Sequence, residues 1–122
     1  MVPGVMKPGE ILFTDRNYKI TEVPDSLAGL TFLRTTIDDF DFEVEAGGEL
    51  YALTPPENEK GAASQETRLR KLGFERTDDP IFQLFPGSIN RVCVYRKTVK
   101  KGERFHFSKV VLPVAGKGVR LK

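Results

Sequence analysis

The chain has 122 residues and a mass of 13.7 kDa, of which 39% are hydrophobic and 30% are charged. This size and balance predict one globular domain with a single core. The 19 basic and 17 acidic residues leave a net charge of +2, which is too small to indicate a nucleic-acid partner. The apolar stretches fall far short of the roughly 20 residues of a transmembrane helix. One cysteine excludes an intramolecular disulfide.

The N-terminal third predicts a loose start followed by short strands. Residues 1–10 carry two prolines and two glycines without a period, so we expect a flexible lead-in before one domain over residues 11–122. They also lack the apolar core of a signal peptide. Residues 18–21 and 31–37 are strand candidates. Residues 40–45 alternate strictly, with Phe40, Phe42 and Val44 on one face and acids on the other, which predicts a half-buried strand.

The middle of the chain predicts a hairpin. Gly47 and Gly48 permit a tight turn with positive φ. We therefore expect residues 50–53 to fold back antiparallel against residues 40–45. The prolines at positions 55 and 56 end that strand.

A single short helix is expected after these prolines. Ser64 can cap it and Glu66 lies in its first turn, with basic residues in its last turn and Gly73 as its stop. Leu69 and Leu72 form its apolar pair. Nothing else in the chain has the period of a helix.

The C-terminal third predicts a second hairpin. Residues 81–85 form a short buried strand candidate, and two apolar runs between residues 91 and 114 are joined by the basic turn of residues 100–103. Phe105 and Phe107 share one parity, whereas Val110, Leu112 and Val114 share the other. This change predicts a β-bulge near residues 108 and 109.

These elements predict an all-β fold, an antiparallel β-sandwich of jelly-roll or galactose-binding-like type with one short helix. The inner faces of its two sheets should carry a shared set of core residues. That set is Phe40, Phe42, Val44, Tyr51, Val92, Val94, Phe105 and Phe107.

The sequence contains no motif that assembles a catalytic site, a metal site or a cofactor site. Asp38, Asp39 and Asp41 lack the remaining ligands of a calcium loop. The only histidine, His106, is expected at the surface. Cys93 lies between two valines and is expected to be a packed small hydrophobe. We therefore assign no catalytic residue, no metal and no cofactor.

Carbohydrate binding by stacking needs an exposed aromatic ring beside planar polar groups. The chain has no tryptophan, so its three tyrosines are the candidates, although tyrosines on strands are more often core residues. The candidate ligand-binding residues are Arg16, Asn17, Tyr18, Arg91 and Tyr95.

The order of elements resembles a known group of domains. Three segments carry the resemblance, helped by residues 12–18 and 23–30 at the start. They comprise Leu50, Tyr51, Ala52, Leu53 and Pro55; then Leu72, Gly73, Phe74 and Thr77; then Val94, Tyr95, Arg96, Lys97, Gly102, Glu103 and Phe107. This pattern resembles the small β-sandwich domains attached to secreted bacterial carbohydrate-active enzymes, namely sialidase-like glycosyl hydrolases and polysaccharide lyases.

The resemblance implies a fold and a context and transfers no active-site residue. It implies a noncatalytic accessory domain that binds glycan weakly or packs against an adjacent catalytic domain. It also implies a secreted or periplasmic protein, so that residues 1–122 would be a processed segment. The alternative is a small hydrolytic enzyme that uses a carboxylate pair, either Asp38 with Asp39 or Asp78 with Asp79.

Overall fold

The computed structural model describes residues 2–57, 64–86, 91–107 and 111–122. Within these ranges it contains ten strands and one helix. Their bounds are β1 (Val2–Val5), β2 (Thr31–Arg34), β3 (Phe40–Ala46), β4 (Gly48–Thr54), α1 (Glu66–Lys71), β5 (Glu75–Arg76), β6 (Phe82–Gln83), β7 (Arg91–Val99), β8 (Arg104–Phe107), β9 (Leu112–Ala115) and β10 (Arg120–Leu121).

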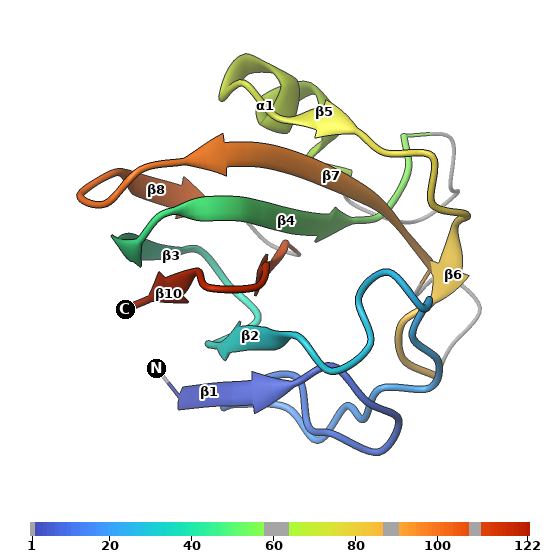
Figure 1. Cartoon of the computed structure of the whole chain (residues 1–122). Coiled ribbons are helices and arrows are strands. Elements are labelled where there is room, and N and C mark those ends of the chain that lie inside the picture. The colour runs from blue at the N-terminus through green and yellow to red at the C-terminus, as the bar shows by residue number, and fades with distance from the viewer. Residues whose placement is uncertain (1, 58–63, 87–90, 108–110) are drawn as a thin grey trace.

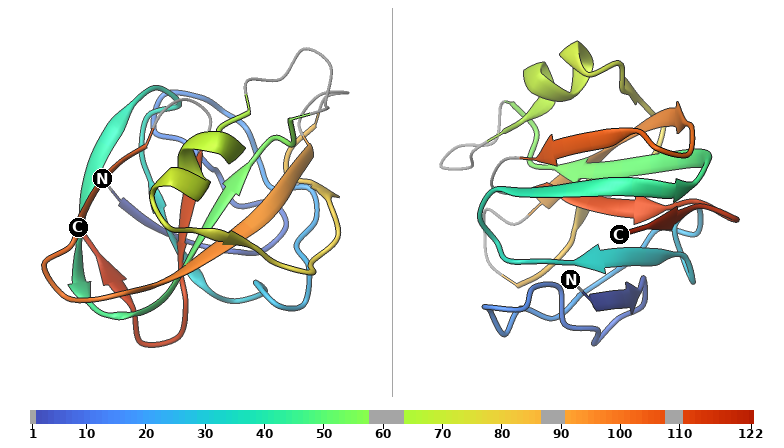
Figure 2. Two further views of the ribbon diagram at one scale, coloured as in Figure 1. Left: turned by 90° about the horizontal axis from the view of Figure 1, so that it is seen from above. Right: turned by 90° about the vertical axis from the view of Figure 1, so that its left-hand side faces the viewer.

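The strands form two antiparallel sheets, as the sequence predicted for an all-β sandwich. The large sheet has the order β1-β2-β9-β4-β7-β5, with β6 also paired to β7. It runs from β5 at the top of Figure 1 to β1 at the bottom. The small sheet has the order β10-β3-β8. The helix α1 lies at one end of the molecule and β1 at the opposite end (Figure 2).

The large sheet carries an apolar core on each of its faces. One core includes Leu53, Val92 and Val94 and packs against residues of the N-terminal segment. The other includes Leu50, Ala52 and Tyr95 and packs against the small sheet and α1. The predicted core residues are therefore divided between two clusters. Val92 and Val94 belong to one, whereas Phe42, Val44, Phe105 and Phe107 belong to the other.

The register of β3 is as predicted. Phe42 and Val44 are buried, and Asp41 is exposed. The ring centroid of Phe42 lies 5.5 Å from that of Phe105 and 4.9 Å from that of Phe107. Phe40 and Tyr51, also predicted to be core residues, are only partly buried.

The hairpin predicted at Gly47 and Gly48 is wrong. β3 pairs with β8 and β10, whereas β4 pairs with β7 and β9. The glycines instead form a corner at which the chain crosses from the small sheet to the large one. A Cβ on Gly47 would lie 2.6 Å from the carbonyl oxygen of Val99, and Gly48 has a φ of +147°. Close backbone approach and a positive φ both require glycine here.

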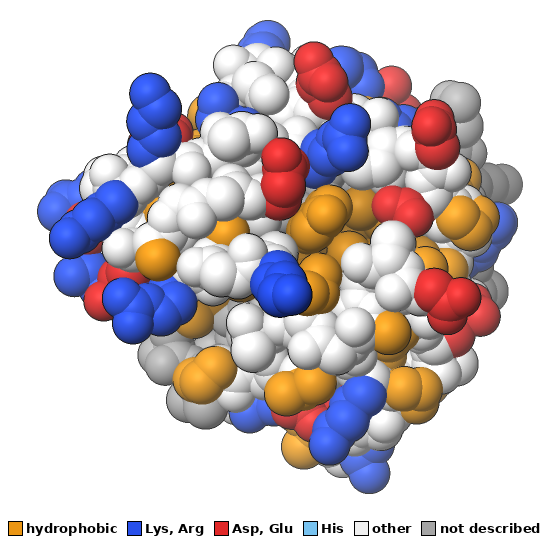
Figure 3. Space-filling model, viewed as in Figure 1, with side chains coloured by type: hydrophobic (Ala, Val, Ile, Leu, Met, Phe, Trp, Pro, Cys, Tyr) orange, Lys and Arg blue, Asp and Glu red, His pale blue; other side chains and the backbone are white. Residues whose placement is uncertain are grey.

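The hairpin predicted between residues 91 and 114 is also wrong. The turn at residues 100–103 is tight, with Glu103 N donating to Lys100 O, and Gly102 has the expected positive φ of 93°. However, β7 belongs to the large sheet and β8 to the small one. Lys and Arg side chains gather at the left edge of Figure 3, where Figure 1 places this turn.

The change of parity after Phe107 has the same origin. Phe105 and Phe107 of the small sheet belong to one core cluster, whereas Leu112 and Val114 of β9 in the large sheet belong to the other. The two groups therefore lie in different sheets and face different cores. The predicted bulge itself falls on residues 108–110, which lie outside the described residues.

The first ten residues, expected to be a flexible lead-in, contain the edge strand β1. It pairs with β2 from Val2 opposite Arg34 to Val5 opposite Thr31. Glu10 fastens this edge, because its Oε1 accepts from Val5 N at 3.2 Å and from Arg34 at 2.8 Å. The proline and glycine content concealed a strand that tertiary pairing stabilises.

The expected helix is present as α1. Ser64 Oγ accepts a hydrogen bond from Glu66 N at 3.2 Å. Gly73 ends the helical segment with a φ of +95°. Leu69 is fully buried in the core beneath the helix.

Truncation of Phe42 to alanine is expected to lower the free energy of unfolding by about 3 to 5 kcal/mol, because the lost ring leaves a cavity among three aromatic neighbours. Urea denaturation measures the change. Val5→Ala, which removes an exposed side chain, is the control and should change stability by less than about 0.5 kcal/mol. Equal effects of the two variants would contradict the assigned register.

Candidate functional site

The predicted ligand-binding residues separate into different parts of the molecule. Tyr18 is 38% exposed, and Arg16 and Asn17 beside it are exposed as well. Arg91 is exposed at the start of β7, opposite Gln83. Tyr95 has an exposure of 0%, so its ring offers no face to a sugar. The prediction that Tyr95 binds a sugar by stacking is therefore wrong, because β7 is buried on both sides at this point.

Tyr18 forms an aromatic platform with the rings beneath it. Its ring lies parallel to that of Phe85, with centroids 4.9 Å apart and an interplanar angle of 9°. Phe13 meets both rings edge-on. This aromatic platform, defined by Phe13, Tyr18 and Phe85, therefore holds a partly exposed ring in a fixed orientation.

The loop that carries Arg16 is fixed through Asp15. One carboxylate oxygen of Asp15 accepts from Ile37 N at 3.0 Å, and the other lies 3.4 Å from Arg16 Nη1. Arg16 also donates to the carbonyl oxygen of Asp15. The Arg16 guanidinium is thus held against Asp15, in the loop that leads to Tyr18.

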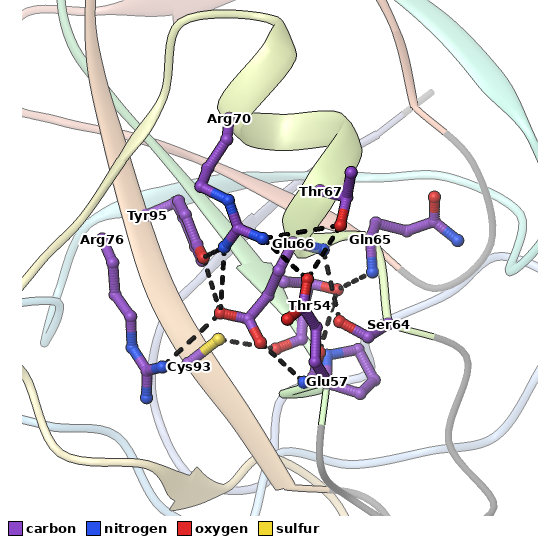
Figure 4. Close-up of polar contacts among 11 residues, drawn as sticks. Thr54, Glu57, Ser64, Gln65, Glu66, Thr67, Arg70, Arg76, Cys93 and Tyr95 are labelled. Atoms are coloured by element: carbon purple, nitrogen blue, oxygen red, sulfur yellow. Dashed lines mark hydrogen bonds and ion pairs between the residues drawn. The ribbon is translucent and has the colours of Figure 1, made fainter.

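A buried carboxylate at α1 was not predicted. Glu66 is only 4% exposed. Its Oε1 accepts from the Tyr95 hydroxyl at 2.5 Å and lies 3.5 Å from Arg76, while its Oε2 accepts from Glu57 N at 2.6 Å. Figure 4 shows these groups converging between the helix and the sheet. We call Glu57, Glu66, Arg70, Arg76 and Tyr95 the Glu66 network.

Arg70 completes the Glu66 network from the next helical turn. It donates to the Tyr95 hydroxyl at 2.9 Å and to Glu57 Oε1 at 2.7 Å. Hydrogen bonds thus run from Arg70 through Tyr95 to Glu66, and each bond polarises the next. The spacing of four residues between Glu66 and Arg70 was visible in the sequence, but it is equally common on exposed helix faces.

Burial suppresses acid-base chemistry at this position. It raises the pKa of the Tyr95 phenol to about 12, and the hydrogen bond to Glu66 acts in the same direction. Burial likewise raises the pKa of the neighbouring Cys93 thiol to about 12. Both groups are protonated at neutral pH, so neither is an activated base or nucleophile. The Glu66 network joins α1, β5 and β7 rather than assembling reactive groups.

One residue of each acidic pair considered as catalytic, Asp39 and Asp79, has a side-chain partner in the local structure. The Asp79 carboxylate accepts from Ser26 at 2.7 Å and from Thr77 at 2.8 Å. Asp39 and Asp41 flank His106, at 3.4 Å and 2.7 Å. Within the described ranges, no group of three or more His, Cys, Asp or Glu side chains could hold a metal ion.

Comparison with known protein families, with curated proteins and with solved structures finds no match for this chain. The resemblance to accessory domains of carbohydrate-active enzymes therefore stays a prediction. Among the residues that the structure describes, no helix is long and apolar enough to cross a membrane.

Replacement of Tyr95 by phenylalanine is expected to lower the free energy of unfolding by about 1 to 3 kcal/mol, because the buried Glu66 carboxylate loses a hydrogen bond. Chemical denaturation at neutral pH measures the loss. Tyr51→Phe on the neighbouring strand is the matched control, since no hydrogen bond of its hydroxyl contributes to the Glu66 network. A Tyr95→Phe protein as stable as this control would mean that the hydroxyl contributes nothing.

The pair of His106 and Asp41 predicts a pH dependence. The hydrogen bond to Asp41 raises the pKa of His106 above its ordinary value of 6.5, and Asp39 acts in the same direction. Because the pKa of His106 is raised in the folded state, the pair stabilises the fold fully below about pH 6.5. This stabilisation is lost as the pH rises through the folded-state pKa. The Tm difference between the wild type and His106→Gln should therefore shrink between about pH 5.5 and pH 8. A Tm difference that grows over this interval would mean that the pKa of His106 is lowered, not raised, in the folded state.

Proposed function

We propose that the chain is a noncatalytic accessory domain of a secreted glycan-degrading protein, and that it contacts glycan weakly through the aromatic platform. The observation that carries this proposal is the partly exposed ring of Tyr18, held parallel to Phe85 at 4.9 Å. A ring fixed in this way loses little conformational freedom when a sugar stacks on it.

The neighbouring polar groups support the same role. Arg16 is half exposed and anchored by Asp15, and Asn17 is exposed beside it. A guanidinium and an amide in the same loop as an exposed aromatic ring supply planar donors and an acceptor for sugar hydroxyls. Contact through one ring and two side chains predicts weak binding.

The wider context of the proposal comes from the sequence resemblance. Domains of that type are attached to glycosyl hydrolases, sialidases and polysaccharide lyases of bacteria. An adjacent catalytic domain would be the natural partner of this chain, with localisation outside the cytoplasm.

The isolated chain is expected to bind oligosaccharides weakly, with a Kd on the order of 1 mM, and to hydrolyse no glycoside. Titrations followed by NMR should shift the resonances of residues 13–18, and Tyr18→Ala should abolish these shifts. Ile11→Ala, which truncates a similarly exposed side chain of the same segment, is the control and should leave binding unchanged.

Catalysis would refute the accessory role. The decisive result is turnover of an aryl glycoside by the pure protein that is lost in Asp39→Asn or Asp79→Asn. Binding that survives Tyr18→Ala would separately exclude the aromatic platform as the contact.

A further inference from the structure

A pocket of about 400 Å³ opens beside the Glu66 network. Its lining includes Pro56 and Glu57, which follow β4, Glu66 and Arg70 of α1, Arg76 of β5, and Ile81 before β6. A volume in this range accommodates a small ligand.

Arg76 is the group of this pocket with the most unused bonding capacity. Its side chain is 45% exposed, and its one hydrogen-bond partner in the described part of the chain is Glu66, at 3.5 Å. Figure 4 shows it apart from the other side chains, joined to them by one contact. A guanidinium has five N–H donors in a planar fork, so most of these remain for a ligand.

Glu57 supplies the complementary acceptor. Its Oε1 accepts from both Thr67 and Arg70. The hydrogen bond from Thr67, and after it the one from Arg70, lowers the pKa of the Glu57 carboxyl group. The carboxylate is therefore ionised at neutral pH. Its second oxygen accepts no hydrogen bond from the described residues. Donor and acceptor therefore line the same pocket.

Among the described residues that line the pocket, the charges balance. Glu57 and Glu66 oppose Arg70 and Arg76, and ion pairs join them. An added anion or cation would leave an uncompensated charge in a partly desolvated site, which costs free energy. A neutral ligand avoids this cost, and the partly exposed Ile81 offers apolar surface to its carbon atoms.

We propose that this pocket binds a neutral polyhydroxylated molecule of monosaccharide size. Arg76 donates to ligand hydroxyls, Glu57 accepts from them, and Ile81 contacts the apolar face of the ligand. This site shares no residue with the aromatic platform, so it goes beyond the proposed function and does not rest on it.

The test is an NMR titration of the full chain with methyl glucoside and methyl galactoside, with sodium glucuronate as the charged counterpart. At least one neutral glycoside should shift the resonances of residues 56–57 and 75–81 in a saturable way. A Kd of about 1 to 10 mM is expected for a site of this size. The absence of such shifts for both glycosides, or tighter binding of glucuronate than of either, would overturn the proposal.

Two variants of Arg76 separate recognition from folding. Arg76→Met removes the donors, and Arg76→Lys keeps the charge but loses the planar fork. Both should weaken binding at least about tenfold, and the lysine variant should retain the wild-type NMR spectrum in the absence of ligand. Wild-type affinity in a folded Arg76→Lys protein would overturn the proposed contact.

Tyr18→Ala distinguishes this site from the aromatic platform. It should leave the shifts of residues 75–81 and their midpoint unchanged. Loss of these shifts in Tyr18→Ala would assign the binding to the platform and refute a second site.

Discussion

The rest of the structure depends on the position of β4, which pairs along both of its edges and is covered on both of its faces. β7 and β9 take its backbone hydrogen bonds, while Leu50 and Leu53 point into different cores. A strand with two apolar faces cannot be stable at the surface of a simple sandwich. The N-terminal segment must cover one face, and the small sheet with α1 must cover the other.

The Glu66 network follows from this requirement. A six-residue helix has little stability of its own, so tertiary contacts must hold α1 over the sheet. Leu69 supplies the apolar contact, and the bonds from Glu66 to Tyr95 and to Glu57 N supply a directional one. The buried carboxylate is tolerated because each of its oxygens has a partner. In the same network Arg76 is partly exposed, and most of its N–H donors have no partner among the described residues.

The sequence predicted elements better than it predicted their partners. The alternation of β3, the helix at residues 66–71 and the positive φ of Gly73 and Gly102 were all predictable, because local sterics and side-chain period decide them. Both hairpins were wrong, since a glycine turn has the same local signature whether the next strand pairs with the last one or enters another sheet. The burial of Glu66 could not be predicted for a related reason. It depends on the packing of α1 against β7, where Glu66 meets Tyr95.

The carboxylate of Glu10 has a consequence for self-association. β1 is an edge of the large sheet, and an exposed edge invites pairing with another copy. Along β1, the backbone groups of every second residue point away from β2, toward the free edge. At Val5 the N–H donates to Glu10, and at Pro3, two residues earlier, there is no N–H. This edge therefore offers a second chain almost no backbone donors. β1 is thus a regular strand at the border of the sheet that gives a second copy little backbone with which to pair.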